Sequence, residues 1–288
     1  MLAKELRETN RFMEKSWCRL GPRAGVVALI LLAACSSKEN TVNIHNGTAG
    51  SAGAAAELPD CSDAGSASQT RGSPMAPVGN LAGQCFWMDV REASIEEYAA
   101  FVAGGHAETA PFCAWNTSYD PVCAEAGSGE AGAGDVTLPV TCADWCDAYS
   151  FCKWAGKSLC KGEYGNPADA ARSDWYAVCS HGAVREYPYG EYTPDACNGM
   201  EKGVGAALAA GGQASCATPE GVLNLSGNVA EWVDECIDET GAGDKCNVRG
   251  GWFASDANAL RCGEKRAITR DARFDWAGFR CCAYGPED

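Results

Sequence analysis

Eighteen cysteines in 288 residues constrain the fold of this chain more than any other feature. Cys18 precedes an apolar run, Cys35 follows it, and the other sixteen cysteines are spread from residue 61 to residue 282. An even number of cysteines in an exported chain is typical of disulfides. A zinc site would need closely spaced cysteine pairs or cysteines with histidines, and the chain has three histidines in all. We therefore expect a disulfide-rich fold.

Residues 1–34 have the pattern of an export signal. Six basic residues lead into an unbroken apolar run at Ala24–Ala34, which is too short to span a bilayer as a helix. The run ends in L-A-A-C, which resembles a bacterial lipoprotein signal that is cleaved before Cys35, so that the Cys35 thiol carries lipid. The alternatives are an ordinary signal peptide or an anchor helix. Ser36, rather than Asp, after the lipidated cysteine favours the outer membrane of the cell envelope.

Residues 35–75 are rich in Ala, Gly and Ser and cannot bury a core. We expect them to form a flexible tether, tied by Cys61 to a domain at residues 76–288. The formal net charge of −15 excludes nucleic acid as a natural partner, because phosphate binding requires a basic surface. The expected partners are the membrane, through the lipid anchor, and a ligand outside the cell.

Regular structure is predicted mainly in the first half of the domain. Ser94 and Glu97 have the spacing of a capping box, which predicts a helix that begins after Ser94. Asp144, with Asp147 three residues later, predicts the start of a second helix in the same way. From Tyr187 onwards there are few helix signals, and we expect irregular strands and long loops.

The stretch N-L-S-G-N-V-A-E-W, Asn224–Trp232, combines three signals. Asn224 and Glu231 offer side-chain oxygens, Gly227 tolerates positive φ, and Trp232 suits a core. Side-chain oxygens with nearby backbone carbonyls are what a Ca²⁺ ion requires. The same residues also describe a hairpin turn followed by a core tryptophan, and the residues alone leave both interpretations open.

Further motifs flank this stretch in a characteristic order. R-G-G lies at 249–251, R-C at 261–262, G-F-R-C at 278–281, W-C-D-A-Y-S-F-C-K-W-A-G-K at 145–157 and Y-P-Y-G at 187–190. Together with N-x-x-G-N-x-x-E-W, this order resembles the formylglycine-generating enzyme (sulfatase-modifying factor) family over about Gly83 to Tyr284. The resemblance implies an α+β domain, a variant of the C-type lectin fold with little regular secondary structure.

The chain departs from this family at the reactive site. The family's enzymes oxidise a client cysteine to formylglycine with copper held by two thiolates, and the corresponding positions here are Ser255 and Leu260. Neither side chain supplies the soft thiolate that Cu(I) prefers. In addition, Trp252 replaces the family's Ser after Gly-Gly, and Ala230 replaces the first Trp of its N-x-W-E-W. We therefore expect a retained fold that does not bind copper.

The resemblance also implies a structural calcium ion and two disulfides. The calcium ligands would be the side chains of Asn224 and Glu231 and the backbone carbonyls of Gly227 and Val229. The implied disulfides are Cys152–Cys281 and Cys179–Cys262, and proximity in the sequence suggests Cys113–Cys123 and Cys236–Cys246. Cys282, next to the assigned Cys281, is the remaining candidate for a free thiol.

Other catalytic arrangements have little support. A non-haem iron site uses two histidines and a carboxylate, but His106 and His181 lie in unrelated segments. No G-x-S-x-G nucleophile motif is present. A polar pocket or a solvated ionic surface would account for the charged residues near the C-terminus, which are Asp256, Glu264, Arg266, Arg270, Asp271, Arg273 and Asp275.

The sequence thus predicts a surface-tethered lipoprotein whose domain binds a protein or glycan outside the cell and lacks thiol oxidase activity. The alternative is a metal-dependent oxidoreductase of the same family that acts through a different site. Whether the purified protein retains copper or iron distinguishes the two.

Overall fold

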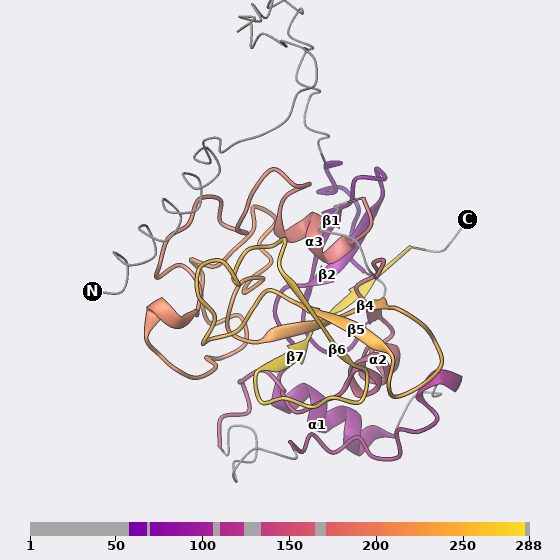
Figure 1. The fold of residues 1–288 in the computed structure, drawn as a ribbon. Helices are drawn as coiled ribbons and strands as arrows, with labels where there is room; N and C mark the ends of the chain where they lie inside the picture. Colours follow the sequence, from indigo (N-terminus) through magenta and orange to yellow (C-terminus); the bar gives the residue numbers. More distant parts are fainter. Residues whose placement is uncertain (1–57, 68–69, 106–109, 124–133, 165–170, 286–288) are drawn as a thin grey trace, which may run out of the picture. The chain divides into compact units, whose positions relative to one another are not determined.

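This computed structural model describes residues 58–67, 70–105, 110–123, 134–164 and 171–285. The predicted signal peptide, Cys35 and the first part of the tether lie outside these residues, as does His106. The chain clusters into two units, Met1–Ala52 and Gly53–Asp288, and the second contains every described element (Figure 1). No helix in the described ranges has the length and apolar composition needed to cross a membrane.

Three α-helices occur in the described residues, and the first two begin where the sequence predicts. The Ser94 side chain accepts a hydrogen bond from the Glu97 amide, and the Glu97 carboxylate accepts one from the Ser94 amide. Asp144 and Asp147 form the same reciprocal pair. The helices are α1 (Ile95–Gly104), α2 (Trp145–Trp154) and α3 (Asp174–Cys179), with 3₁₀ turns η2 (Pro111–Cys113) and η3 (Met200–Lys202).

One four-stranded sheet joins the two ends of the domain. Its order is β1-β2-β8-β3, and every neighbouring pair is antiparallel. The strand nearest the C-terminus, β8, therefore lies between strands from the first half of the domain. The strands are β1 (Met75–Gly79), β2 (Cys85–Asp89), β3 (Ser158–Leu159) and β8 (Cys281–Ala283).

The second sheet carries the motifs of the C-terminal half. Its order is β6-β5-β4-β7, with β4 antiparallel to β5 and parallel to β7 (Figure 1). The stretch Asn224–Trp232 leads directly into β4, so its last residues are part of a central strand. The strands are β4 (Ala230–Cys236), β5 (Lys245–Arg249), β6 (Lys265–Thr269) and β7 (Ala277–Phe279).

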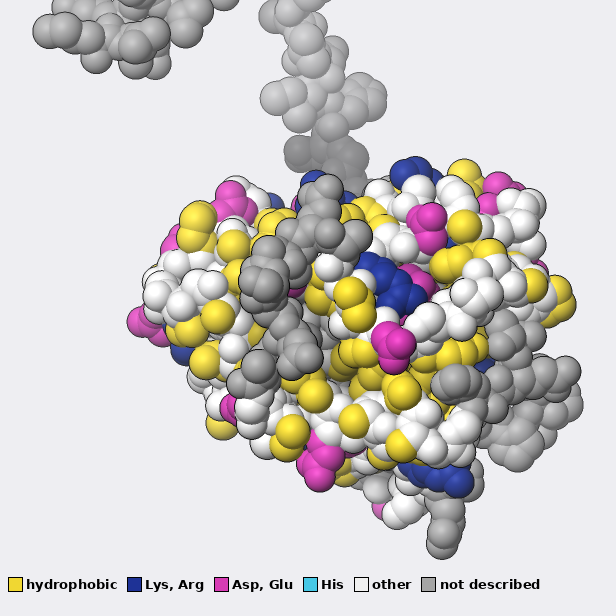
Figure 2. All heavy atoms as spheres, turned by 90° about the horizontal axis from the view of Figure 1, so that it is seen from below, with side chains coloured by type: hydrophobic (Ala, Val, Ile, Leu, Met, Phe, Trp, Pro, Cys, Tyr) yellow, Lys and Arg dark blue, Asp and Glu magenta, His cyan; other side chains and the backbone are white. Residues whose placement is uncertain are grey.

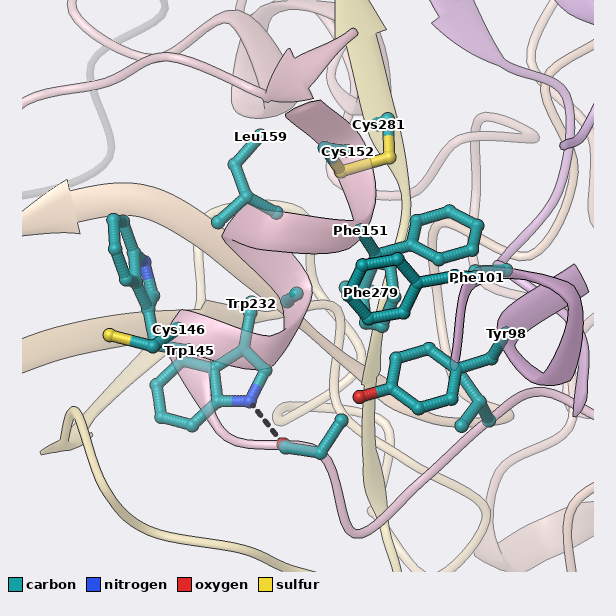
Figure 3. Close-up of a cluster of buried hydrophobic side chains, with 14 of the residues drawn as sticks. Tyr98, Phe101, Trp145, Cys146, Phe151, Cys152, Leu159, Trp232, Phe279 and Cys281 are labelled. Atoms are coloured by element: carbon teal, nitrogen blue, oxygen red, sulfur yellow. Dashed lines mark hydrogen bonds between the residues drawn. A yellow bond between two sulfur atoms is a disulfide. The ribbon is translucent and has the colours of Figure 1, made fainter. Parts of the chain in front are cut away.

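An aromatic core packs α1 and α2 against the second sheet (Figure 3). The Phe151 ring of α2 stacks on Tyr98 of α1 at 5.9 Å and meets Phe279 of β7 edge-on at 5.1 Å. Trp232, which is buried, donates its indole N–H to the Ala143 carbonyl at 3.0 Å. The tryptophan of the Asn224–Trp232 stretch is therefore a core residue, and it fixes the start of β4 in place.

All sixteen cysteines in the described residues form disulfides. Three of the expected pairs are present: Cys152–Cys281, Cys179–Cys262 and Cys236–Cys246. Cys282 pairs with Cys160 and is not a free thiol. The remaining disulfides are Cys61–Cys85, Cys113–Cys146, Cys123–Cys142 and Cys197–Cys216.

The expected pair Cys113–Cys123 is wrong. Cys113 of η2 bonds to Cys146 in the first turn of α2, and Cys123 bonds to Cys142 just before that helix. Both cysteines of the 110–123 segment thus attach to the start of α2, because the segment packs along that helix. Proximity in the sequence did not reflect this tertiary contact.

Part of the predicted tether is packed on the domain. Cys61 is bonded to Cys85 of β2, and Arg71 donates hydrogen bonds to the carbonyls of Trp154 and Ala155 at the end of α2. Met75 already belongs to β1. The ordered contacts of this domain therefore begin before residue 76.

Candidate functional site: a pocket at the altered reactive site

The Asn224–Trp232 stretch forms a tight turn before β4. Asn224, Gly227 and Asn228 have φ values of 59°, 73° and 63°. A Cβ atom on Gly227 would lie 2.3 Å from the Asn198 carbonyl oxygen, so only glycine fits there. The motif's glycine is required by this close approach.

Asn228 joins three segments through its side-chain amide. Its Oδ1 accepts hydrogen bonds from the Leu208 amide at 2.8 Å and from Asn198 Nδ2 at 3.1 Å. Its Nδ2 donates to the Glu92 carboxylate at 2.8 Å. Both Asn228 and Glu92 are buried, so these bonds satisfy groups that water cannot reach.

Glu231 is buried in a two-point ion pair with Arg280 from the G-F-R-C motif. Arg280 Nε donates to Oε2 and Nη2 donates to Oε1, each at 2.7 Å. The Trp175 indole N–H also donates to Oε2 at 2.7 Å. The geometry is that of a strong charge-assisted pair, and it joins the first of the four motifs in the C-terminal half to the last.

The oxygens around this pair fit the calcium ion that the family resemblance implies. Asn224 Oδ1 is buried without a hydrogen-bond partner among the described residues. Among the described residues, Glu231 Oε1 accepts one hydrogen bond, from Arg280, which leaves this oxygen further acceptor capacity. Asn224 Nδ2 lies 3.3 Å from Glu92, a second buried carboxylate. These donors are hard oxygens of the kind that calcium prefers.

The local charge also suits a cation. Glu92 and Glu231 both interact with the single guanidinium of Arg280. Burial raises the pKa of Glu92, Arg280 opposes this rise, and Glu231 adds to it. Two buried carboxylates that share one arginine disfavour each other's ionisation, and a cation at Asn224 and Glu231 would favour the charged form of both.

Ser255 and Leu260, the positions that the resemblance matches to the family's copper ligands, lie together and have structural roles. Ser255 Oγ accepts a hydrogen bond from the Trp252 amide at 3.0 Å and closes a turn. Leu260 is buried, and a Cβ on Gly199 would lie 2.4 Å from Leu260 Cδ1 and 3.1 Å from the Ser255 carbonyl oxygen. Both residues therefore pack around Gly199, and neither offers a thiolate.

The R-G-G motif belongs to the scaffold. The Arg249 guanidinium is buried and contacts both carboxylate oxygens of Glu235, at 2.8 and 2.9 Å. Gly250 and Gly251 then turn the chain with φ values of 88° and 68°. A Cβ on Gly251 would lie 2.6 Å from the Ala259 carbonyl oxygen, so this glycine keeps the 251–260 loop closed.

A pocket of about 270 Å³ lies beside this loop. Ala230 of β4 and Trp252 are part of its wall, and these are two of the positions at which the chain departs from the family. Compared with the family's pattern, this chain has a small side chain at 230 on the strand and a large aromatic ring at 252 in the loop. The other lining residues are Val248, Gly251, Ala259, Glu264, Lys265 and Arg266.

Three aromatic rings form a continuous stack that ends at this pocket. Phe274 stacks on Trp276 with the ring centroids 4.5 Å apart, and Trp276 stacks on Trp252 at 4.8 Å. The Arg266 guanidinium lies 5.5 Å from the Trp276 centroid and 6.0 Å from that of Trp252. We call Phe274, Trp276 and Trp252 the aromatic stack. Trp276 was missed in the sequence, because no linear spacing relates it to Trp252.

The charged residues near the C-terminus divide between two places. Glu264 and Arg266 line the pocket of the aromatic stack, whereas Asp271 and Arg273 line a separate pocket of about 430 Å³. Arg273 Nη2 lies 2.6 Å from Asp144 and 2.8 Å from Asp147. The charged residues near the C-terminus therefore do not form one common pocket. On the face drawn in Figure 2, basic and acidic side chains adjoin in a hollow ringed by hydrophobic ones.

Asp147 shares its arginine with Asp144, and its proton affinity is altered. Burial raises the pKa of Asp147 to about 8, the neighbouring Asp144 carboxylate adds to the rise, and Arg273 opposes it. Both carboxylates also cap α2, so the group has a structural role at the start of that helix.

The structure places the remaining metal candidates apart. His181 Nδ1 lies 3.1 Å from Glu220 and forms a local pair. Within the described ranges, no group of three or more His, Cys, Asp or Glu side chains is arranged to hold a metal ion. The calcium site implied by the resemblance has one acidic ligand, Glu231, and its other ligands are the Asn224 side chain and backbone carbonyls. The absence of a group of three such side chains in the described ranges therefore does not test it.

Comparison with known proteins gives one family and several related folds. The sequence profile of the sulfatase-modifying factor enzyme 1-like domain matches residues 32–284. Treponema denticola variable protein 1 is similar in structure, with 15% identity, a TM-score of 0.51 and coverage of 73% of this chain and 95% of that one. PvdO from Pseudomonas aeruginosa has 18% identity, a TM-score of 0.50 and coverage of 70% and 81%.

A third solved structure, CarF, has 16% identity, a TM-score of 0.49 and coverage of 70% of this chain and 87% of that one. At these identities, the likeness to solved structures concerns the fold alone. No curated protein sequence matches the chain.

Proposed function

Because the chain belongs to the sulfatase-modifying factor enzyme 1-like family, we propose that it is a ligand-binding member without the thiol oxidase activity of the family's enzymes. Its ligand is a protein or glycan outside the cell. The lipidated Cys35 anchors it in the cell envelope, at the outer membrane, and the following Ala/Gly/Ser-rich segment gives it reach.

The observation that carries this proposal is the replacement of the reactive site by an aromatic pocket. Trp252 borders the pocket at the end of the aromatic stack, beside the loop that holds Ser255 and Leu260. A rigid, partly exposed indole is a good contact surface because it supplies a large area at low entropic cost. The absence of thiolates at Ser255 and Leu260, together with the presence of an indole at Trp252, supports a role in ligand binding and not in the oxidation of a client cysteine.

Loss of the copper site is supported by the state of the thiols. Oxidation of a client cysteine by the family's route requires two protein thiolates on the metal. Every cysteine in the described residues is in a disulfide, so none of these can replace the two that are missing. Serine and leucine cannot hold Cu(I).

The test has a chemical arm and a binding arm. Copper-loaded protein is incubated with a peptide that contains the Cys-x-Pro-x-Arg sulfatase motif, and the mass of the peptide is followed. We expect no conversion of thiol to aldehyde, whereas turnover above a protein-free control would overturn the proposal. The double variant Ser255→Cys/Leu260→Cys is expected to gain copper binding, because these two positions meet at Gly199.

In the binding arm, intrinsic tryptophan fluorescence is titrated with a panel of oligosaccharides and peptides. A ligand of this pocket is expected to lose binding in Trp252→Ala and to keep it in Trp115→Ala, a partly buried tryptophan at another surface. Equal loss in both variants would place the ligand elsewhere and argue against the proposal.

A further inference from the structure

A second pocket adjoins the pocket of the aromatic stack. It has a volume of about 460 Å³ and shares Glu264 and Lys265 with the first pocket. Its walls come mainly from two segments, 183–186 and 261–265, with Tyr176 of α3. The Cys262 amide donates to the Glu186 carbonyl at 2.8 Å, and Cys262 is bonded to Cys179, so the two segments are held side by side. The second pocket is therefore a built feature of the fold.

Three cationic side chains line this second pocket: Arg185, Arg261 and Lys265. Two acidic residues, Glu186 and Glu264, also line it, which leaves positive charge in excess. The whole chain carries a net charge of −15, so a local excess of positive charge is unusual for it. Such a patch attracts anions.

Two of these cations, Arg185 and Arg261, keep donor groups that the described residues leave unpaired. The half-exposed Arg261 side chain interacts with Tyr187 and pairs with Glu186, whose Oε2 lies 3.6 Å from Nε. Its Nε makes no hydrogen bond in the described part of the chain, so the guanidinium has donor capacity left for a ligand. Arg185 makes no ion pair with any described residue. Burial lowers the pKa of Lys265, the nearby Arg249 adds to this, and Glu235 opposes it. A bound carboxylate or sulfate would supply the missing acceptors.

We propose that the ligand is an acidic oligosaccharide, with a sugar ring on Trp252 and a carboxylate or sulfate group between Arg185 and Arg261. This inference rests on the proposed function, because it specifies the ligand of the same surface. The C–H bonds of a sugar face carry partial positive charge and lie favourably on the negative face of an indole. Arginine provides paired donors for the acidic group.

An acidic peptide is the competing occupant, and the structure favours it less. Strand β6 lies at the edge of its sheet, where an extended peptide could add as a further strand. However, β6 begins with Lys265 and Arg266, and charged side chains on an edge strand discourage such pairing. A saccharide needs no backbone pairing and uses the ring and the cations together.

The experiment compares charged and uncharged forms of the same sugars. The full-length protein is titrated with oligogalacturonate and its methyl-esterified form, with a sulfated oligosaccharide and its desulfated form, and with an oligoglutamate peptide. The two pairs distinguish carboxylate from sulfate recognition. We expect one acidic sugar to bind at least about tenfold more tightly than its uncharged form, because charge-assisted hydrogen bonds are lost in the latter.

Variants separate the two pockets. Arg185→Ala and Arg261→Ala are each expected to weaken the acidic sugar about tenfold and to leave the uncharged sugar unchanged. Trp252→Ala is expected to weaken both forms, and Trp252→Phe to retain part of the binding because it keeps a ring. Arg172→Ala, an exposed arginine outside the pocket, serves as the matched control. Thermal unfolding checks that each variant is folded.

Each other outcome overturns the inference. Equal binding of charged and uncharged sugars, lost in Trp252→Ala, would reject the acidic ligand and leave the proposed function standing. Tighter binding of oligoglutamate than of any sugar would reject it in favour of a peptide. Binding of no sugar in either form would also reject it, and the fluorescence panel with Trp115→Ala then decides the proposed function separately.

Discussion

Lys157 and Asp89 form a fully buried ion pair, with Nζ and Oδ1 separated by 2.5 Å. The pair joins the end of β2 to the turn after α2, and Asp89 Oδ2 also accepts from the Cys281 amide at 2.9 Å. It therefore lies where the N-terminal and C-terminal strands of the first sheet meet, and its removal tests how that junction is held.

Replacing one partner of this pair is expected to be much worse than replacing both. Lys157→Met leaves a buried carboxyl group without its cation and is expected to cost about 3–5 kcal/mol of unfolding free energy. The double variant Asp89→Asn/Lys157→Met is expected to recover most of this loss. Chemical denaturation measures both, with Lys153→Met on the exposed face of α2 as the control. A double variant as unstable as the single one would show that the charges are not what matters.

Stability is expected to fall as the pH rises from about 4 to about 8, because of Asp147. Its pKa is raised from 3.8 to about 8 in the fold, so the folded form keeps a proton that the unfolded chain releases at lower pH. Raising the pH therefore favours the unfolded state until the folded group also ionises. Thermal unfolding across this range should show a flatter dependence in Asp147→Asn. Asp271→Asn, an exposed acid of the pocket that Arg273 lines, should leave the slope unchanged.

Removal of calcium is expected to lower the melting temperature. The proposed ion uses Asn224, whose Oδ1 is buried without a partner in the described structure, so Asn224→Gly should abolish the effect of a chelator. Glycine preserves the backbone at φ 59° and removes the ligand oxygen together with the Nδ2 group that donates to Glu92. Asn258→Gly, at an exposed position, should keep the response. An absent chelator effect on the unmodified protein would reduce this stretch to a structural turn.

The disulfides are expected to differ in their contribution according to loop length. Cys152–Cys281 spans 129 residues and Cys236–Cys246 spans 10. In the chain-entropy account, the longer loop contributes about 4–5 kcal/mol and the shorter about 2–3 kcal/mol. Paired Cys→Ser variants compared by denaturation should show the larger loss for the 129-residue loop. Equal losses would indicate that local packing around each sulfur pair dominates.

The mature protein is expected to begin at a diacylglyceryl Cys35. Mass spectrometry of the N-terminal peptide from the native host detects this modification directly. Cys35→Ser should release the protein from the membrane fraction, whereas Cys61→Ser, which removes a disulfide of the domain, should not. An unmodified N-terminus elsewhere would exclude the lipid anchor.

Local features could be predicted from the sequence because their partners are close in the chain. The capping boxes at Ser94 and Asp144 are examples, since each involves groups three residues apart. The resemblance to the family also allowed the fold and the disulfide Cys152–Cys281 to be predicted. Features of this chain that the family does not share could not be predicted in this way.

The binding surface is such a feature. Arg185 and Arg261 line one pocket although they lie in separate segments, and Trp252 meets Trp276 across the end of the second sheet. Neither of these tertiary contacts can be predicted from periodicity or spacing, because both depend on the conformation of long loops. The failed pair Cys113–Cys123 has the same cause, since the true partners were set by packing on α2.

The adjacent cysteines of β8 impose an order on the biogenesis of the domain. Cys281 bonds to Cys152 and Cys282 bonds to Cys160, and both partners lie before the middle of the domain. Neither bond can form until β8 has been synthesised and the thiols of Cys281 and Cys282 can be oxidised. During that delay, Cys152 and Cys160 are open to wrong pairing with other thiols. Disulfide isomerisation is therefore expected to assist maturation of the domain, and loss of β8 would leave it without either of its two longest covalent crosslinks.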